Sequence, residues 1–285
     1  MKRCLHCDAV FEGADWECPA CGNRPLDGDF LRFTGASGAS AFPESSFDLL
    51  AGLEQRSFWF RARNTIVLAA IRRFAAEPTS FFELGCGTGF VLQGVSRAFP
   101  TARLVAGEPA GEGLEVARER VPRATLIQVD GRRIPYRDEF ELIGVFDVLE
   151  HVDEDEAVLA ELRAALVPGG SIVLTVPQHP WLWSAADDFG KHKRRYTRTE
   201  LVSKLRRGGL QVAYVTSFMT TLLPLMVLSR RRQQDLSRFD PAQELRIPPR
   251  IDRLLERIVG TERHAVQHGV SLPAGGSLLA VARRA

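Results

Sequence analysis

The chain has 285 residues, of which 45% are hydrophobic and 25% are charged, and its formal net charge is +2. This composition excludes an intrinsically disordered chain, and the length suits one α/β domain of ordinary size with a small accessory module. So small a net charge gives no general attraction to nucleic acid, although residues 191–195 and 230–232 are short basic runs.

Four of the five cysteines lie within the first 21 residues, as the CxxC pairs Cys4/Cys7 and Cys18/Cys21. No apolar segment of signal-peptide length precedes them, so we expect a cytoplasmic protein, and a reducing compartment favours a metal over disulfides. Four thiolates saturate a tetrahedral ion and therefore predict a structural zinc site, with an adventitious thiol cluster or an iron site as the alternatives. Residues 1–26 are then a zinc-ribbon-like module that depends on its metal to fold.

The next segment, residues 27–46, is rich in Gly, Ser and Ala and is interpreted as a linker. It leads to a predicted catalytic domain over residues 47–285. An amphipathic helix is expected at the start of this domain, within residues 53–74. Phe58, Trp59 and Arg63 are its candidate lid residues, although core packing accounts for the aromatic side chains equally well.

From residue 80 onwards, short apolar runs alternate with helical patterns, which is typical of parallel βαβ units. We expect strands near residues 80–84, 103–107, 125–129, 142–147, 171–176, 211–217 and 277–284, with helices near 90–98, 112–120, 155–166 and 199–207. These elements predict an α/β fold with a doubly wound, seven-stranded, mostly parallel sheet.

The first of these strands ends in FFELGCGTG, where Gly85, Gly87 and Gly89 turn the chain into a helix. Glycine at such a turn lets the backbone approach a ligand closely. A nicotinamide fingerprint needs its third glycine one position later, where the chain has Phe90, so a dehydrogenase is disfavoured.

With Glu83 ahead of them, these glycines form an acidic residue followed by GxGxG, and residues 50–220 resemble the class I S-adenosylmethionine-dependent methyltransferases. The resemblance implies that S-adenosylmethionine binds at the first three strand ends. In that family an acid after the second strand binds the ribose, and an acid after the third approaches the adenine. The resemblance assigns to the cofactor Glu83, Gly85, Gly87, Gly89, Glu108, Asp130, Gly131 and Phe146. An ordinary Asp-Gly turn is the alternative at Asp130.

Acidic and histidine side chains follow the fourth strand. Asp147, Glu150 and His151 have the spacing acid-x-x-acid-His, which is similar to an element of ubiquinone-pathway O-methyltransferases that can serve a divalent cation. The alternative is that Glu150 or Asp153 only favours the start of the next helix.

The loop after the fifth strand, residues 177–197, combines histidine, tryptophan and basic residues and is a candidate wall of the acceptor pocket. The candidate catalytic residues are His151, His179, His192 and Tyr196. The alternative is that the tryptophans close the domain surface and that residues 191–195 are a solvated basic run.

Residues 218–270 form a connection far longer than a hairpin, which predicts a helical insertion before the last strand. Its beginning is apolar and then basic, a profile suited to an apolar acceptor or a peripheral contact with a membrane. It is too short and too polar to span a membrane.

The sequence therefore predicts methyl transfer from S-adenosylmethionine to a small-molecule or lipid-like acceptor, at an oxygen atom. One alternative is an RNA methyltransferase with a zinc module, which the modest net charge disfavours. Another is a zinc-ribbon adaptor that binds the cofactor without catalysis, which the intact Glu83, Gly87, Glu108 and Asp130 disfavour.

Overall fold

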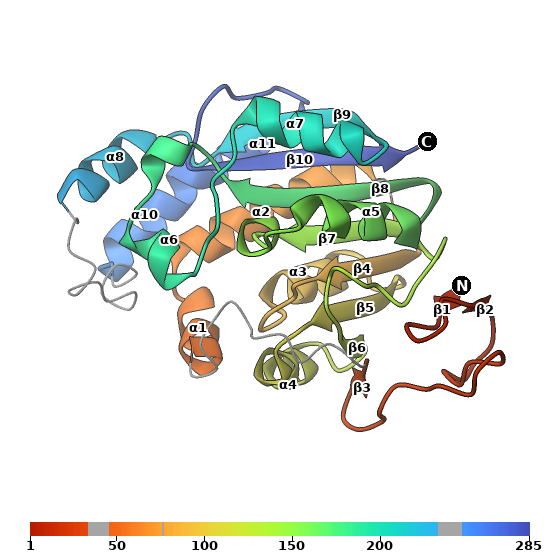
Figure 1. Cartoon of the computed structure of the whole chain (residues 1–285). Coiled ribbons are helices and arrows are strands. Elements are labelled where there is room, and N and C mark those ends of the chain that lie inside the picture. The colour runs from red at the N-terminus through yellow and green to blue at the C-terminus, as the bar shows by residue number, and fades with distance from the viewer. Residues whose placement is uncertain (34–45, 76, 233–246) are drawn as a thin grey trace.

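The computed structural model of the chain describes residues 1–33, 46–75, 77–232 and 247–285. Figure 1 shows a central twisted sheet with helices on both faces and a small N-terminal module beside it. The arrangement confirms the predicted α/β class, with a mostly parallel central sheet.

The central sheet has the strand order β3-β6-β5-β4-β7-β8-β10-β9. Its strands are β3 (Leu31–Arg32), β4 (Ser80–Leu84), β5 (Arg103–Glu108), β6 (Thr125–Gln128), β7 (Phe140–Phe146), β8 (Leu166–Pro177), β9 (Leu210–Phe218) and β10 (Ser277–Arg284). β10 runs antiparallel to β8 and β9, whereas the pairings from β3 to β8 are parallel. The carboxyl ends of β4, β5 and β7 thus meet at one edge of the sheet, where a parallel α/β fold binds its ligands.

The sheet has eight strands rather than the predicted seven, and the additional one comes from the segment predicted to be a linker. In β3, Leu31 pairs with Ile127 and Arg32 with Gln128. Phe30 and Phe33 on either side of β3 are buried. Two residues are too few to give a periodic pattern, so the sequence contains no strand signal here. Residues 34–45 of the predicted linker lie outside the described residues.

Helices cover both faces of the sheet. They are α1 (Ser46–Glu54), α2 (Phe58–Phe74), α3 (Phe90–Ala98), α4 (Gly111–Arg120), α5 (Asp155–Ala165), α6 (Ala185–Phe189) and α7 (Arg198–Arg207), with the 3₁₀ turns η1 (Leu149–His151) and η2 (Pro180–Leu182). One hydrophobic cluster joins α2, α3 and α4 to the sheet, and a second joins α5 and α7 to it. The helix expected within residues 53–74 begins only at Phe58, because Ser57 caps α2 and accepts a hydrogen bond from the Trp59 amide at 3.3 Å, and residues 53 and 54 are the end of α1.

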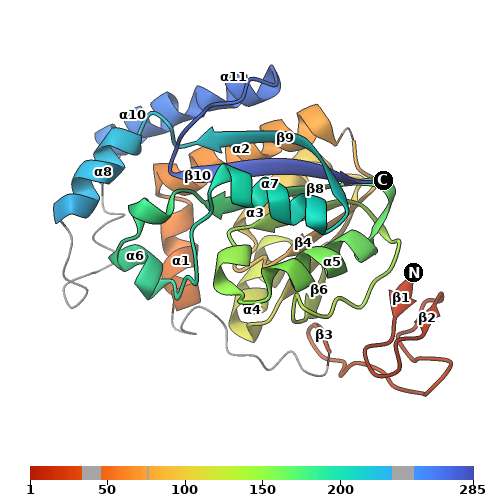
Figure 2. The ribbon, with the colours of Figure 1, turned by 45° about the horizontal axis from the view of Figure 1, so that its top comes forward.

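The connection between β9 and β10 contains α8 (Leu223–Arg232), α10 (Pro249–Gly260) and α11 (Glu262–Gln267), so the insertion is helical where it is described. α10 and α11 pack along α2, as Figure 2 shows. Asp252 fixes this contact, since it accepts a hydrogen bond from the Phe58 amide at 2.7 Å and pairs with Arg61 at 2.5 Å. Within the described residues, the structure contains no helix with the length and apolarity to cross a bilayer.

The N-terminal module contains β1 (Lys2–Arg3) and β2 (Val10–Phe11), and it packs against the methyltransferase-like domain. Arg3 donates from its amide to the Pro135 carbonyl at 3.0 Å and pairs with Glu161 at 2.8 Å. The Trp16 ring meets Phe33 and Tyr136 edge-on. In both views α1, α6, α8 and α10 gather at one end of the sheet, and the module lies at the other.

The outer edge of β9 is covered by a neighbouring loop. The Ser217 amide donates to the Leu272 carbonyl at 3.1 Å, and Arg198 donates to the Val215 carbonyl at 2.9 Å. The backbone groups of Val215 and Ser217 on this edge are therefore paired within the chain.

Candidate active site

The turn after β4 depends on its glycines. Gly85, Gly87 and Gly89 all have positive φ, between 50° and 75°. A Cβ at Gly85 would meet a methyl group of Val148 at 2.3 Å, whereas a Cβ at Gly87 would meet nothing within 4 Å. Gly85 is thus required by packing, and Gly87 leaves its backbone open to the space in front of the sheet.

Two buried carboxylates surround this turn. Glu108, at the end of β5, accepts hydrogen bonds from the amides of Gly87 at 3.0 Å and Ala110 at 3.3 Å. Burial raises the pKa of Glu108 to about 7. Burial also raises the pKa of Glu83 to about 8, and the nearby charges of Glu108 and Glu54 add to the effect. Among the described residues, Glu83 Oε2 has no hydrogen-bond partner.

A buried polar network joins α1 to the glycine turn, and sequence reasoning missed it. Thr88 donates to Glu54 at 2.6 Å, and Arg120 binds the same carboxylate at 2.5 Å. Arg120 also donates to the Ala51 carbonyl at 3.0 Å. These contacts hold α1 as one wall of the cleft.

Asp130 and Gly131 follow β6 and line the same cleft. Arg132 binds the Asp130 carboxylate at 2.6 Å. Although burial opposes the effect, hydrogen bonds from Arg132 lower the pKa of Asp130, so the carboxylate is ionised near neutral pH.

Asp147 and Glu150 lie on the other side of the cleft, after β7. Arg63 pairs with Asp147 at 2.6 Å, and Thr175 donates to Asp147 at 3.1 Å. Glu150 is fully buried, and neither of its carboxylate oxygens has a hydrogen-bond partner among the described residues. Burial and then the charge of Asp147 raise the pKa of Glu150 well above its usual range.

His151 and His192 meet beside Glu150. Their rings lie 4.7 Å apart, and one ligand atom from each of Glu150, His151 and His192 lies within 4.8 Å of the other two. Burial and the neighbouring His192 lower the pKa of His151 to about 4, so its imidazole is neutral at pH 7. The predicted trio with Asp147 is thus replaced by one with His192, because Asp147 is engaged by Arg63.

His192 is oriented by a buried ion pair. Its Nδ1 lies 2.9 Å from Asp187, which Arg195 binds through Nε at 2.7 Å and Nη2 at 3.0 Å. Although burial opposes the effect, the hydrogen bond to His192 and the charge of Arg195 lower the pKa of Asp187. The ring of His192 is therefore held with its Nε2 away from Asp187.

Most of these side chains line one cleft of about 1040 Å³, whereas Arg120, Thr175 and Asp187 are not part of its lining. Its lining includes every residue predicted for the cofactor except Gly89, which caps α3. His151 and His192 also line the cleft, as do the predicted lid residues Phe58, Trp59 and Arg63.

Two predicted catalytic residues lie outside this cleft. Tyr196 is fully buried, and its hydroxyl donates to Asp155 at 2.7 Å, on the side of α5. The loop thus uses Tyr196 for packing rather than for lining the pocket. His179 stacks on Trp181 with ring centroids 4.9 Å apart and does not line the cleft either.

The four thiols of the N-terminal module converge. Cys4 Sγ lies 3.7 Å from Cys21 Sγ, and Cys7 Sγ lies 3.6 Å from Cys18 Sγ. All four sulfur atoms lie within 4.8 Å of one another.

Comparison with known proteins gives a consistent result. Residues 82–174 match a family model described as a methyltransferase domain. A probable S-adenosylmethionine-dependent methyltransferase of Mycolicibacterium smegmatis is 26% identical over 179 residues, which is 61% of this chain and 67% of that protein. The malonyl-[acyl-carrier protein] O-methyltransferase of Halalkalibacterium halodurans is 28% identical over 106 residues, 35% of this chain and 39% of the relative.

The fold is also shared with solved structures. A methyltransferase of Haloferax volcanii, solved in complex with the activator Trm112, superposes with a TM-score of 0.57. The match covers 83% of this chain and 96% of that one at 18% identity, so it supports the fold alone. The family-model match over residues 82–174, the methyltransferase relatives and the strand order of the sheet together support a class I S-adenosylmethionine-dependent methyltransferase domain in this chain.

Proposed function

We propose that the protein transfers a methyl group from S-adenosylmethionine to an oxygen atom of a small-molecule or lipid-like acceptor. The observation that carries this proposal is the position of a neutral, half-buried His151 close to the fully buried Glu150, in the same cleft as Glu83 and Glu108. A hydroxyl acceptor needs a base, and a neutral imidazole can accept its proton.

The cofactor half of the cleft fits S-adenosylmethionine. Glu108 stands at the end of β5, where a carboxylate accepts hydrogen bonds from both ribose hydroxyls, and Asp130 stands at the end of β6 for the adenine amino group. Glu83 offers an oxygen that lacks a partner among the described residues to the cationic methionine end. When bound, the cofactor supplies an activated methyl group on its sulfonium.

The remaining residues of the cleft orient the acceptor and exclude water. Arg63 holds Asp147 in place, and the Asp187–Arg195 pair fixes the ring of His192. In-line displacement needs mainly such alignment, so positioning accounts for most of the catalysis that the chain's own residues can provide.

The acceptor half of the cleft is apolar towards its mouth, which favours a lipid-like or aromatic acceptor. Leu222, Leu225 and Met226 of the insertion line it together with Phe189. An acceptor with an apolar body and a hydroxyl group would bury its body there and direct the hydroxyl towards His151.

Zinc fits the four thiols of the N-terminal module. A tetrahedral ion with zinc–sulfur bonds of about 2.3 Å requires sulfur–sulfur distances of about 3.8 Å. The distances of 3.7 and 3.6 Å agree with this geometry. Cys4, Cys7, Cys18 and Cys21 would hold the ion as a structural site, consistent with a cytoplasmic location.

A divalent cation also fits the acceptor side of the cleft. Glu150 has two buried oxygens without partners among the described residues, and His192 has Nδ1 held by Asp187, the usual support of a metal-binding imidazole. In this alternative, Glu150, His151 and His192 would be the ligands, and the ion, in place of proton acceptance by His151, would activate an acceptor hydroxyl by lowering its pKa.

The test is to incubate the protein with methyl-labelled cofactor and cell extract, and then to separate lipid, small-molecule, protein and nucleic-acid fractions. We expect label in the lipid or small-molecule fraction, and none with the His151→Gln variant, which should still bind the cofactor. Label found only in RNA or protein would contradict the proposal.

A further inference from the structure

Exposed apolar side chains are concentrated at one end of the molecule. Of the 11 large apolar residues that are exposed in the described part of the chain, seven come from η2 with its C-cap, α8 and α10. These are Trp181, Trp183, Leu225, Leu228, Ile251, Leu254 and Ile258. An apolar surface gathered in this way marks a contact surface rather than scattered exposure.

The helix α10 carries the most regular part of this surface. Ile251, Leu254 and Ile258 recur at spacings of three and four residues, so they share one side of the helix. Their exposed fractions are 50%, 56% and 38%. The packed side of α10, with Asp252 and Val259, faces α2 instead. The exposed apolar ridge is therefore not used in the contact with α2.

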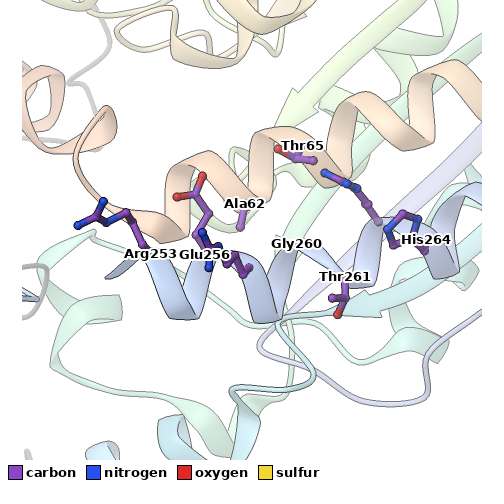
Figure 3. Close-up of a pocket in the computed structure, with 9 residues that line it drawn as sticks. Ala62, Thr65, Arg253, Glu256, Gly260, Thr261 and His264 are labelled. Carbon is purple, nitrogen blue, oxygen red and sulfur yellow. The ribbon is translucent and has the colours of Figure 1, made fainter. Parts of the chain in front are cut away.

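Arginines flank this ridge. Arg250, Arg253 and Arg257 are exposed and follow one another along α10 on the solvent side. Arg253 and Arg257 also line a cavity of about 440 Å³ between α2 and the α10–α11 pair, which Figure 3 shows. Arg263 and His264 line it from α11.

The cavity is cationic in character. Glu256 is the carboxylate in its lining, and Arg61 binds that carboxylate at 2.7 Å. The remaining charges of the lining are those of the arginines, with hydroxyl groups from Thr65 and Thr261. Guanidinium and hydroxyl groups together suit a phosphate-bearing headgroup.

The same surface adjoins the mouth of the active-site cleft. Leu225 and Met226 of α8 and Leu255 of α10 line that cleft, while Leu254, one residue before Leu255, lies on the exposed side. An apolar phase in contact with α8 and α10 would thus lie directly at the entrance for the acceptor.

We infer that the face formed by η2, α8 and α10 docks on an anionic lipid bilayer, with the apolar ridge of α10 at the acyl boundary. The inference rests on the proposed function in that docking would deliver a lipid-like acceptor to the cleft. Tryptophans beside the ridge suit the interfacial region, and the arginines suit anionic headgroups. A second copy of the chain fits less well, because a two-fold contact would bring the same arginines together.

The test is flotation of the full-length protein with vesicles of phosphatidylcholine alone and with 30% phosphatidylglycerol (about a third of the lipid, enough for a negative surface). We expect the protein to bind the anionic vesicles at low salt. Its binding to the neutral vesicles should be weaker by at least roughly tenfold. Replacing Arg250, Arg253 and Arg257 by Gln should weaken binding on the order of a hundredfold. Leu254→Ser with Ile258→Ser should weaken it about tenfold or more.

Val270→Ser is the matched control, since Val270 is 51% exposed but lies outside η2, α8 and α10. Each variant is also titrated with S-adenosylmethionine, whose binding should be unchanged, so a failure of docking is separable from a failure of the proposed function. No flotation with anionic vesicles, or equal flotation of all variants, would overturn the inference. The inference would also be overturned if the parent protein is a dimer, the Leu254→Ser/Ile258→Ser variant is a monomer, and both float equally. The apolar ridge would then serve self-association.

Discussion

The carboxylate of Glu108 accepts a hydrogen bond from the Gly87 amide at 3.0 Å, so the end of β5 and the glycine turn after β4 form one unit. Both residues line the cleft, and Glu108 is buried. A ligand that donates hydrogen bonds to Glu108 therefore also contacts the backbone of the glycine turn.

Cofactor affinity should rise with pH because Glu108 must ionise to accept hydrogen bonds from the ribose. With a pKa of about 7, the affinity should fall roughly tenfold for each pH unit below 7. Calorimetry at several pH values should show this, with proton release on binding. The Glu108→Gln variant should bind the cofactor at least about tenfold more weakly than the parent protein. Its cofactor affinity should also no longer change with pH around 7. Glu115→Gln, at an exposed position of α4, is the control. If the cofactor affinity of Glu108→Gln depends on pH as in the parent protein, Glu108 does not bind the ribose.

The cofactor-free protein should lose stability as the solution becomes more alkaline. Glu83 and Glu108 have folded pKa values of about 8 and 7, above the usual 4.5. The folded state thus binds more protons than the unfolded state, and the stability that these groups contribute is complete below about pH 4.5 and lost as pH rises through 7 and 8. Denaturant titrations between pH 5 and 8 should show a decrease of a few kcal/mol, which Glu83→Gln should reduce. A stability that is flat or rises over this window would contradict the buried state of both carboxyl groups.

The buried pair of Glu54 and Arg120 should stabilise the docking of α1. Both side chains are 9% exposed, so Arg120→Met should cost about 3–5 kcal/mol by leaving the Glu54 charge uncompensated. Chemical denaturation measures this loss, and a double-mutant cycle with Glu54→Gln isolates the pair. The exposed pair of Arg118 and Asp29 is the matched control, with an expected cost below about 1 kcal/mol. Equal losses for the two pairs would show that α1 is held by other contacts.

His151→Gln should lower kcat by roughly 10²–10⁴ and change cofactor affinity little, because His151 faces the acceptor half of the cleft. Since the pKa of His151 is about 4, its protonation should not limit the rate of the parent enzyme above about pH 5. The surface variant His268→Gln should behave as the parent. If activity is lost on chelation while the module's zinc is verified as retained, His151 acts as a ligand of a divalent cation. If the His151→Gln enzyme keeps its full kcat, His151 acts neither as the base nor as a ligand.

Zinc removal should loosen the domain as well as the module. Arg3 and Trp16 of the module contact Glu161 and Tyr136 of the domain, so the purified protein should contain one zinc and melt at a lower temperature after Cys18→Ser substitution. Metal analysis and calorimetric melting test this. Arg3→Ala, which keeps the four thiols, should retain zinc and lose only a part of that stability. An unchanged melting temperature in the metal-free protein would show that the module is an independent appendage.

The convergence of the glycine turn, Glu108 and Asp130 in one cleft could be predicted from the sequence because it depends on local order, whereas their roles toward the cofactor are proposals. Gly85 is needed where a strand turns sharply beside Val148, and Glu108 and Asp130 each follow an apolar run. Such features combine neighbouring residues with the strand order of a parallel fold. The family resemblance then assigned their roles.

The parts that sequence reasoning missed depend on contacts between distant residues. Glu54 and Arg120 meet across 66 residues, and nothing in the segments around them indicates that they pair. In the loop after β8, the direction of each side chain is set by the turns of the backbone, so His192 enters the cleft while Tyr196 packs under α5. A histidine and a tyrosine four residues apart look equally suitable before the loop is folded.

The short strand β3 also affects how the protein behaves at high concentration. It pairs with β6 at Ile127 and Gln128, and the loop with Leu272 together with Arg198 pairs with the edge of β9 at Ser217 and Val215, so these parts of the two edges are closed to another chain. Open edges are the usual template for intermolecular β-pairing. A shortened chain that begins after Phe33 would uncover the edge of β6 at Ile127 and Gln128 and would remove Phe30 and Phe33 from the core. Truncation to the methyltransferase domain alone should therefore give a smaller protein that aggregates more readily.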